Sequence, residues 1–251
     1  MTEAHHKSNR DEPAELIRLS REWRITVLYE DRALLAISKP DGLIAAPESW
    51  SRTRRNLMLY LMEGIRRHAY WAVSRGIRWI KNVHRLDADT SGVLLLAKTP
   101  VALHRMTELW EAHQVAKEYV ALVEGSPRED AFDIERRIAP HPKREGMMVL
   151  DERHGKLATT SVSVLERFPR HTLLLVKPLT GRTHQIRIHL AGAGLPIVSD
   201  TLYGSGRPSP MKRLGLHATR LQFAQPFTGR PLDIHAPWPE DLMRTLAALR
   251  Q

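Results

Sequence analysis

The chain has 251 residues, and 42% of them are apolar, which is enough for an ordinary buried core and argues against global disorder. Its 38 Lys and Arg against 28 Asp and Glu leave a net charge of +10, which suits a polyanionic partner, although a protein that is merely basic fits this charge equally well. The absence of cysteine excludes disulfides, iron–sulfur clusters and cysteine-based zinc sites. The polar start has no signal-peptide pattern, and no apolar run approaches the ~20 residues that a membrane helix needs. We therefore expect a cytoplasmic protein with no membrane partner.

The order of strand and helix signals predicts one α+β domain over residues 23–251, preceded by an arm. Residues 1–22 mix charges and prolines, so we expect them to be flexible or loosely docked. Strands are expected at residues 25–29, 34–38, 93–97, 119–123, 161–165, 173–176, 219–223 and 232–235. Helices are expected around residues 57–65, from Thr99-Pro100 onward, at 184–191 and after Pro239. The pattern favours a mostly antiparallel sheet with helices on its face and ends.

The positive charge is concentrated in residues 51–85, which hold nine basic side chains and one acid, Glu63. The basic residues are Arg52, Arg54, Arg55, Arg66, Arg67, Arg75, Arg78, Lys81 and Arg85. Four aromatic residues lie among them: Tyr60, Tyr70, Trp71 and Trp79. Arginine beside exposed rings is typical of RNA binding, whereas core aromatics under a solvated charged face are the alternative. A second basic patch follows at Arg136, Arg137, Lys143 and Arg144.

Two polar segments hold candidate reactive groups. Residues 84–92, His-Arg-Leu-Asp-Ala-Asp-Thr-Ser-Gly, lead into a buried strand, and Asp87 there is either a reactive group on a rigid support or the cap of a turn. Residues 181–189, Gly-Arg-Thr-His-Gln-Ile-Arg-Ile-His, are expected to start a helix capped by Thr183. A half-buried Arg187 would need an acidic partner, for which Asp87 is the candidate. An exposed Arg187 beside two buried histidines is the alternative.

With three further motifs, these segments resemble the RluA-type pseudouridine synthase family over residues 25–239. The three are residues 39–43 (Lys-Pro-Asp-Gly-Leu), 117–125 (Lys-Glu-Tyr-Val-Ala-Leu-Val-Glu-Gly) and 196–204 (Pro-Ile-Val-Ser-Asp-Thr-Leu-Tyr-Gly). The aspartate segment 84–92 is the most specific. Two departures are visible: Ala46-Pro47 stands where many relatives have His-Pro, and Ser199 stands where a glycine is usual. We also expect the small N-terminal RNA-binding module of many relatives to be absent.

The resemblance implies a single catalytic domain with a mixed, mostly antiparallel sheet, flanking helices and a central active-site cleft. It implies Asp87 as the catalytic aspartate, Tyr119 as the tyrosine that stacks on the target base, and Arg187 as the ion-pair partner of Asp87. Arg85 matches the residue that fills the space left by the flipped nucleotide. Further RNA contacts are expected from Arg66, Arg67, Arg78, Lys81, Arg182 and His184. Structural roles are expected for Asp89 and Asp200.

The implied reaction detaches uracil from its ribose, rotates it and rejoins it through carbon 5. This isomerisation involves no redox step, so we expect no cofactor and no metal. We also expect a monomer, and structured ribosomal or transfer RNA as its partner. A non-catalytic RNA-binding protein on the same fold is one alternative, disfavoured by the presence of Asp87, Tyr119 and Arg187. The 13 histidines suggest a metal-dependent hydrolase, but His184 and His189 are five residues apart and no HExxH or deaminase motif occurs.

Overall fold

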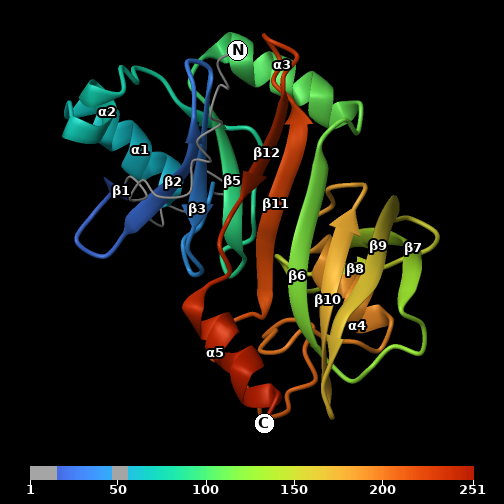
Figure 1. The fold of residues 1–251 in the computed structure, drawn as a ribbon. Coiled ribbons are helices and arrows are strands. Elements are labelled where there is room, and N and C mark those ends of the chain that lie inside the picture. The colour runs from blue at the N-terminus through green and yellow to red at the C-terminus, as the bar shows by residue number, and fades with distance from the viewer. Residues whose placement is uncertain (1–15, 47–55) are drawn as a thin grey trace, which may run out of the picture.

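A twelve-stranded, mostly antiparallel sheet forms the centre of the computed structural model, which describes residues 16–46 and 56–251 (Figure 1). The first six strands are β1 (Leu16–Arg18), β2 (Arg24–Glu30), β3 (Leu34–Lys39), β4 (Lys81–Asn82), β5 (Ser91–Ala97) and β6 (Ala116–Glu124). The last six are β7 (Ala131–Pro140), β8 (Met148–Leu150), β9 (Lys156–Arg167), β10 (His171–Pro178), β11 (Leu216–Ala224) and β12 (Pro231–His235). The main path through the sheet is β1-β2-β3-β5-β11-β6-β10-β9-β7-β8, with β4 paired to β5 and β12 to β11.

Five helices in the described part of the chain divide between the two faces of this sheet. They are α1 (Leu57–Arg66), α2 (Tyr70–Ser74), α3 (Pro100–Glu111), α4 (Gln185–Gly192) and α5 (Glu240–Leu249). Alternation along β6 separates the faces, because Ala121 and Val123 pack with α4 whereas Val120 and Leu122 pack with α5. Helices α1 and α2 cover the α4 face at the β1–β3 end of the sheet, and α3 lies on the α5 face. Tyr119 contacts both apolar clusters of the α4 face, so it lies between the two helical blocks.

The pairing of β5 with β11 is the single parallel one among the strands described, and it joins the β1–β3 half of the sheet to the half that starts with β6. It consists of two residue pairs, Ser91 with His217 and Gly92 with Ala218. Gly92 has a φ of +116°, and a Cβ at this position would lie 2.1 Å from the Ala218 carbonyl oxygen. Only glycine therefore permits this approach, which fixes the last two residues of the aspartate segment, at the start of β5, against β11.

The expected fold class is confirmed, and every expected strand and helix is present. Thr99 caps α3 as predicted, since its side chain accepts a hydrogen bond from the Ala102 amide. Strands β1, β4, β7 and β8 and the short helix α2 were not predicted. Residues 1–15 lie outside the described part, but residues 16–18 of the expected arm form β1, pair with β2 and bury Ile17. This section of the arm is therefore part of the sheet rather than loosely docked.

No helix in residues 16–46 or 56–251 is both long and apolar enough to cross a membrane.

Candidate active site

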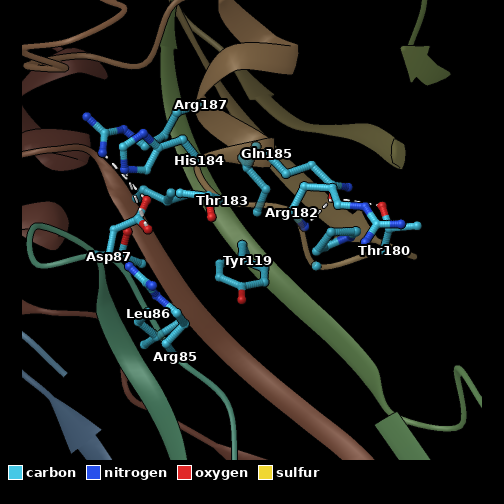
Figure 2. A pocket seen from close by; sticks show the side chains of 15 residues that line it. Arg85, Leu86, Asp87, Tyr119, Thr180, Arg182, Thr183, His184, Gln185 and Arg187 are labelled. Atoms are coloured by element: carbon cyan, nitrogen blue, oxygen red, sulfur yellow. Dashed lines mark hydrogen bonds and ion pairs between the residues drawn. The ribbon is translucent and has the colours of Figure 1, made fainter. Parts of the chain in front are cut away.

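A pocket on the α4 face collects side chains from four distant parts of the sequence. Residues 85–87 and Thr90 form the first part, Tyr119 the second, residues 178 and 180–187 the third, and Leu216 the fourth. Asp87 and Arg182 lie on opposite sides of Tyr119 (Figure 2). Six of the residues expected to bind or react with RNA line it: Arg85, Asp87, Tyr119, Arg182, His184 and Arg187. The fold thus brings the two polar segments and Tyr119 into one cavity.

The aspartate segment is held by buried groups on both sides. Lys39, which is fully buried, donates three hydrogen bonds from Nζ, to the carbonyls of Pro40 (2.8 Å), Leu43 (2.7 Å) and Ala88 (2.8 Å). These bonds use all three donors of an ammonium group and tie the 39–43 turn to the residue after Asp87. The resemblance alone gave no role to Lys39, and its burial was the signal that sequence reasoning lacked.

His84 holds the other end of the segment. Its Nε2 accepts a hydrogen bond from the Leu95 amide (3.0 Å), and its ring stacks on Trp110 with centroids 4.6 Å apart. Burial, aided by the nearby positive charge of Lys117, lowers the pKa of His84 to about 3, so the ring remains neutral and Nε2 can accept. The backbone that carries Asp87 is therefore fixed at both ends, while the Asp87 side chain is 19% exposed to the pocket.

Arg187 is held mainly by Asp200, which sequence reasoning did not identify as its partner. The guanidinium donates from Nε to Asp200 Oδ2 (2.8 Å) and from Nη2 to Oδ1 (2.7 Å), and both side chains are almost fully buried. Asp87 Oδ2 lies 3.5 Å from Arg187 Nη1, beyond ordinary hydrogen-bond length. The expected ion pair between Asp87 and Arg187 is therefore present, but it is the weaker of two, and Asp200 is the principal partner of Arg187.

The pKa directions agree with this arrangement. Burial by itself opposes charge on both groups, yet the bidentate bond raises the pKa of Arg187 and lowers that of Asp200. Asp200 also accepts hydrogen bonds from the amides of Leu202 (2.9 Å) and Tyr203 (3.0 Å). Both groups therefore stay charged, and Arg187 is anchored before any RNA is present.

The start of α4 differs from the expected cap at Thr183. The N-cap residue is His184, whose side chain makes no capping hydrogen bond and whose backbone is left-handed, with φ 55° and ψ 18°. The buried amide of Gln185 holds this turn, because its Oε1 accepts from Thr180 Oγ1 (2.7 Å) and the Arg182 amide (3.0 Å). Its Nε2 donates to β9, to the Thr159 carbonyl and Thr160 Oγ1. The segment is therefore pinned to the sheet by Gln185 rather than by Thr183.

Tyr119 projects from β6 into the pocket, where its ring lies between Asp87 and Arg182 (Figure 2). Burial raises the pKa of Tyr119, and the charge of Asp87 raises it further, so the phenol stays neutral. A neutral ring at this place can stack on a planar base that enters beside Asp87.

The basic segment 51–85 is only partly a free surface. Arg66, Arg67, Arg78 and Lys81 are exposed, and Arg66 and Arg67 contact Glu63. Arg75 differs, because it is buried against Glu30 at 3.0 Å and serves the fold. Arg52, Arg54 and Arg55 lie outside the described residues. Trp71 is buried, as the core alternative proposed, while Tyr70 is 86% exposed.

The second basic patch is also mixed. Arg136 pairs with Glu152, and Arg137 donates to the Gly155 carbonyl (3.0 Å). Lys143 and Arg144 are exposed in the turn between β7 and β8. Within residues 16–46 and 56–251, no group of three His, Asp or Glu side chains is arranged to hold a metal ion.

The departure at Ser199 has a local explanation. Ser199 has a φ of +57°, which favours glycine, and its hydroxyl donates to the Met211 carbonyl at 2.5 Å. This hydrogen bond offsets the conformational strain of a left-handed backbone at a residue that has a Cβ. At the other departure, Pro47 lies outside the described residues.

Comparison with known proteins adds independent findings. The pattern of the RNA pseudouridylate synthase family matches residues 33–192. Ribosomal large subunit pseudouridine synthase D of Xanthomonas campestris pv. campestris is 38% identical over 244 residues, 90% of this chain and 70% of that protein. Ribosomal large subunit pseudouridine synthase C of Escherichia coli (strain K12) is 36% identical over 233 residues, 89% of this chain and 70% of that protein.

Solved structures are similar in fold. Human RNA pseudouridylate synthase domain containing 1 superposes with a TM-score of 0.68 at 26% identity, covering 90% of this chain and 94% of that one. Human RNA pseudouridylate synthase domain containing 4 superposes with a TM-score of 0.72 at 24% identity, covering 89% and 92%.

Proposed function

The chain belongs to the RNA pseudouridylate synthase family, and we propose that Asp87, Tyr119 and Arg187 are the residues that carry its reaction. As a member, the protein is an isomerase that converts uridine in RNA to pseudouridine. The observation that supports the assignment most is the pocket itself, in which one carboxylate lies beside a neutral aromatic ring and an anchored guanidinium.

In this proposal, the target uridine leaves its stack and enters the pocket, at a cost of a few kcal/mol. The Tyr119 ring stacks on the uracil, and Arg85, which is exposed at the rim, enters the space that the base leaves. Both contacts offset the cost of flipping. Arg182 and His184 at the opposite wall contact the flipped nucleotide or its neighbours.

Asp87 then starts the break of the bond between uracil N1 and the ribose, either by attack or by removing a ribose proton. The uracil turns, its carbon 5 bonds to the ribose, and the proton of carbon 5 is released while N1 gains one. Arg187 Nη1 lies 3.5 Å from Asp87 Oδ2, so its positive charge attracts the carboxylate and helps to orient it for this step. The bonds broken and formed balance without any electron donor or acceptor.

The RNA-binding surface in this proposal extends from the pocket rim to α1. Arg66, Arg67, Arg78 and Lys81 are exposed, and α1 covers the same face of the sheet as the pocket. Their charges would hold the phosphates that flank the target. The relatives named as acting on the large ribosomal subunit favour ribosomal RNA over transfer RNA as the substrate. We place this activity in the cytoplasm and assign it to a monomer without a metal ion.

The test compares Asp87→Asn with Asp89→Asn, its exposed neighbour in the same segment. Large-subunit ribosomal RNA and transfer RNA transcripts, labelled with tritium at uridine carbon 5, would report turnover by tritium release. Asp87→Asn should fold, bind RNA and release no tritium, while Asp89→Asn should stay active. Turnover of Asp87→Asn within tenfold of wild type would refute the assignment. Release from transfer RNA alone would reject the ribosomal substrate.

A further inference from the structure

His184 occupies a backbone conformation that costs energy. It is not a glycine, yet its φ of 55° and ψ of 18° are left-handed, and its side chain caps no amide of α4. Glycine or asparagine would adopt this conformation at lower cost. Backbone strain of this kind, at a residue that lines a pocket, points to a use for the side chain itself.

Tyr203 is placed to select which ring nitrogen of His184 bears the hydrogen. The Tyr203 hydroxyl oxygen accepts a hydrogen bond from the Met148 amide (2.8 Å) and lies 2.9 Å from His184 Nδ1. Burial raises the pKa of Tyr203, so the hydroxyl keeps its hydrogen. With the Met148 amide already donating to the oxygen, the hydroxyl hydrogen is free to point at Nδ1. Nδ1 then accepts, and the ring hydrogen resides on Nε2.

That Nε2 faces the carboxylate of Asp87. It lies 3.9 Å from Asp87 Oδ1, while Asp87 Oδ2 lies 3.5 Å from Arg187 Nη1. Figure 2 shows Asp87 pointing toward His184 and Arg187. The two oxygens therefore face two different donors. Both distances exceed hydrogen-bond length, so a shift of about 1 Å on RNA binding would close them.

We propose that His184, with its ring hydrogen placed by Tyr203, is a positioning residue that donates from Nε2 to Asp87 Oδ1 and holds the carboxylate in its reactive orientation. This inference rests on the proposed role of Asp87. It assigns to Tyr203 an indirect part, exerted through His184. The contact with Asp87 is additional to the nucleotide contact that is proposed for His184 above.

Kinetics of a double-mutant cycle test the proposal. Tyr203→Phe and His184→Asn, alone and combined, would be assayed by tritium release from large-subunit ribosomal RNA transcripts. Each single variant should lower kcat on the order of tenfold or more, the scale of one hydrogen bond to a charged group, and leave KM within about threefold. In the His184→Asn background, Tyr203→Phe should change kcat by less than about twofold.

A stability measurement separates this role from a structural one. Tyr203→Phe also deprives the Met148 amide of its acceptor, and this loss does not depend on His184. A loss of stability should therefore remain in the His184→Asn background, where the effect of Tyr203→Phe on kcat disappears. Tyr29→Phe is the matched control, because it removes a part-buried hydroxyl bonded to Asp31 away from the pocket, and its kcat should equal that of wild type. Independent, multiplying losses of kcat, or a rise in KM alone, would overturn the proposal.

Nuclear magnetic resonance provides a readout that needs no activity. The ring nitrogens of ¹⁵N-labelled protein distinguish the two neutral tautomers, and the signals that disappear in His184→Asn identify His184. The wild type should show the Nε2–H form, and Tyr203→Phe should change its population. An Nδ1–H form in the wild type would overturn the proposal even if turnover is normal. Inactive wild-type protein that shows the Nε2–H form would instead reject the proposed substrate.

Discussion

Removing Arg187 should reveal that its principal partner is Asp200. The perturbation is Arg187→Met, made in the wild type and in the Asp200→Asn and Asp87→Asn backgrounds. Breaking a buried ion pair by removing one partner costs about 3–5 kcal/mol. Asp200 keeps its two amide donors when Arg187 is replaced, so the lower end of that range, about 3 kcal/mol, is expected.

The two backgrounds should differ. With Asp200→Asn, the buried carboxylate is already gone, so Arg187→Met should cost about 1 kcal/mol or less, and the coupling energy should be about 2 kcal/mol. With Asp87→Asn, the interaction removed is single, 3.5 Å long and partly hydrated, so the coupling energy should stay below about 1 kcal/mol.

Chemical denaturation would give the free energy of unfolding of the wild type, the three single variants and the two double variants. The comparison requires that the dependence of this free energy on denaturant has the same slope in all six proteins. Arg220 and Asp233 are the matched control, because they form the same bidentate bond (2.7 and 2.6 Å) at the surface. Their coupling energy should be a small fraction of that of Arg187 and Asp200. A coupling with Asp87 as large as that with Asp200 would refute the assignment of partners.

Three further outcomes are expected. Glutamate would replace three exposed arginines together: Arg66, Arg67 and Arg78. The slope of log affinity for RNA against log salt concentration should flatten by about 0.7–0.9 for each phosphate that is no longer bound. Arg244→Glu on α5 is the control and should leave the slope unchanged. An unchanged slope in the triple variant, or an equal effect from the control, would mean that the three arginines face away from the RNA. Burial lowers the pKa of His217 from 6.5 to about 4, so the unfolded chain takes up the proton at a higher pH than the folded protein. The free energy of unfolding should therefore fall as the pH drops from 6.5 to 4, by about 2 kcal/mol at pH 5. The same pH dependence of unfolding in the wild type and in His217→Asn would contradict this. Gly92→Ala should lower the free energy of unfolding by about 3 kcal/mol or more, because the added methyl group clashes with Ala218. Gly76→Ala is the control and should cost about 1 kcal/mol, because Gly76 also has a positive φ but has open space around it. Similar denaturation midpoints for the two variants would refute the packing argument.

Much of the fold could be predicted because its strands are strongly patterned. Short apolar runs of Val, Leu and Ala in β5, β6 and β10 indicate buried strands. Strand β7 was missed because it faces solvent along most of its length and buries only Ile134, Ile138 and Ala139. Strands β1, β4 and β8 have two or three residues each, too few for a period to appear.

The motifs were sufficient to locate the site, but not to predict which of its side chains bond to one another. Asp87, Tyr119 and Arg187 share a pocket, although their roles in the reaction stay predictions. The bond between Arg187 and Asp200 could not be foreseen, because nothing in the sequence says which of two acids reaches a buried guanidinium. Thr183 looked like a cap by residue type, but the left-handed backbone at His184 moved the start of α4 by one residue.

The two-pair contact between β5 and β11 also bears on when the site can form. Ser91 and His217, which share a 2.9 Å hydrogen bond at this junction, are 126 positions apart, so closing it is a late event of high entropic cost. During synthesis, the aspartate segment leaves the ribosome long before the strand that fixes it. Hairpins such as β2–β3 can form early, and Lys39 and His84 can then hold the aspartate segment. The contact with β11 and the opposite wall of the pocket are added only when most of the chain has been made. A nascent or truncated chain would therefore carry the motif without the site, and RNA modification would be restricted to finished molecules.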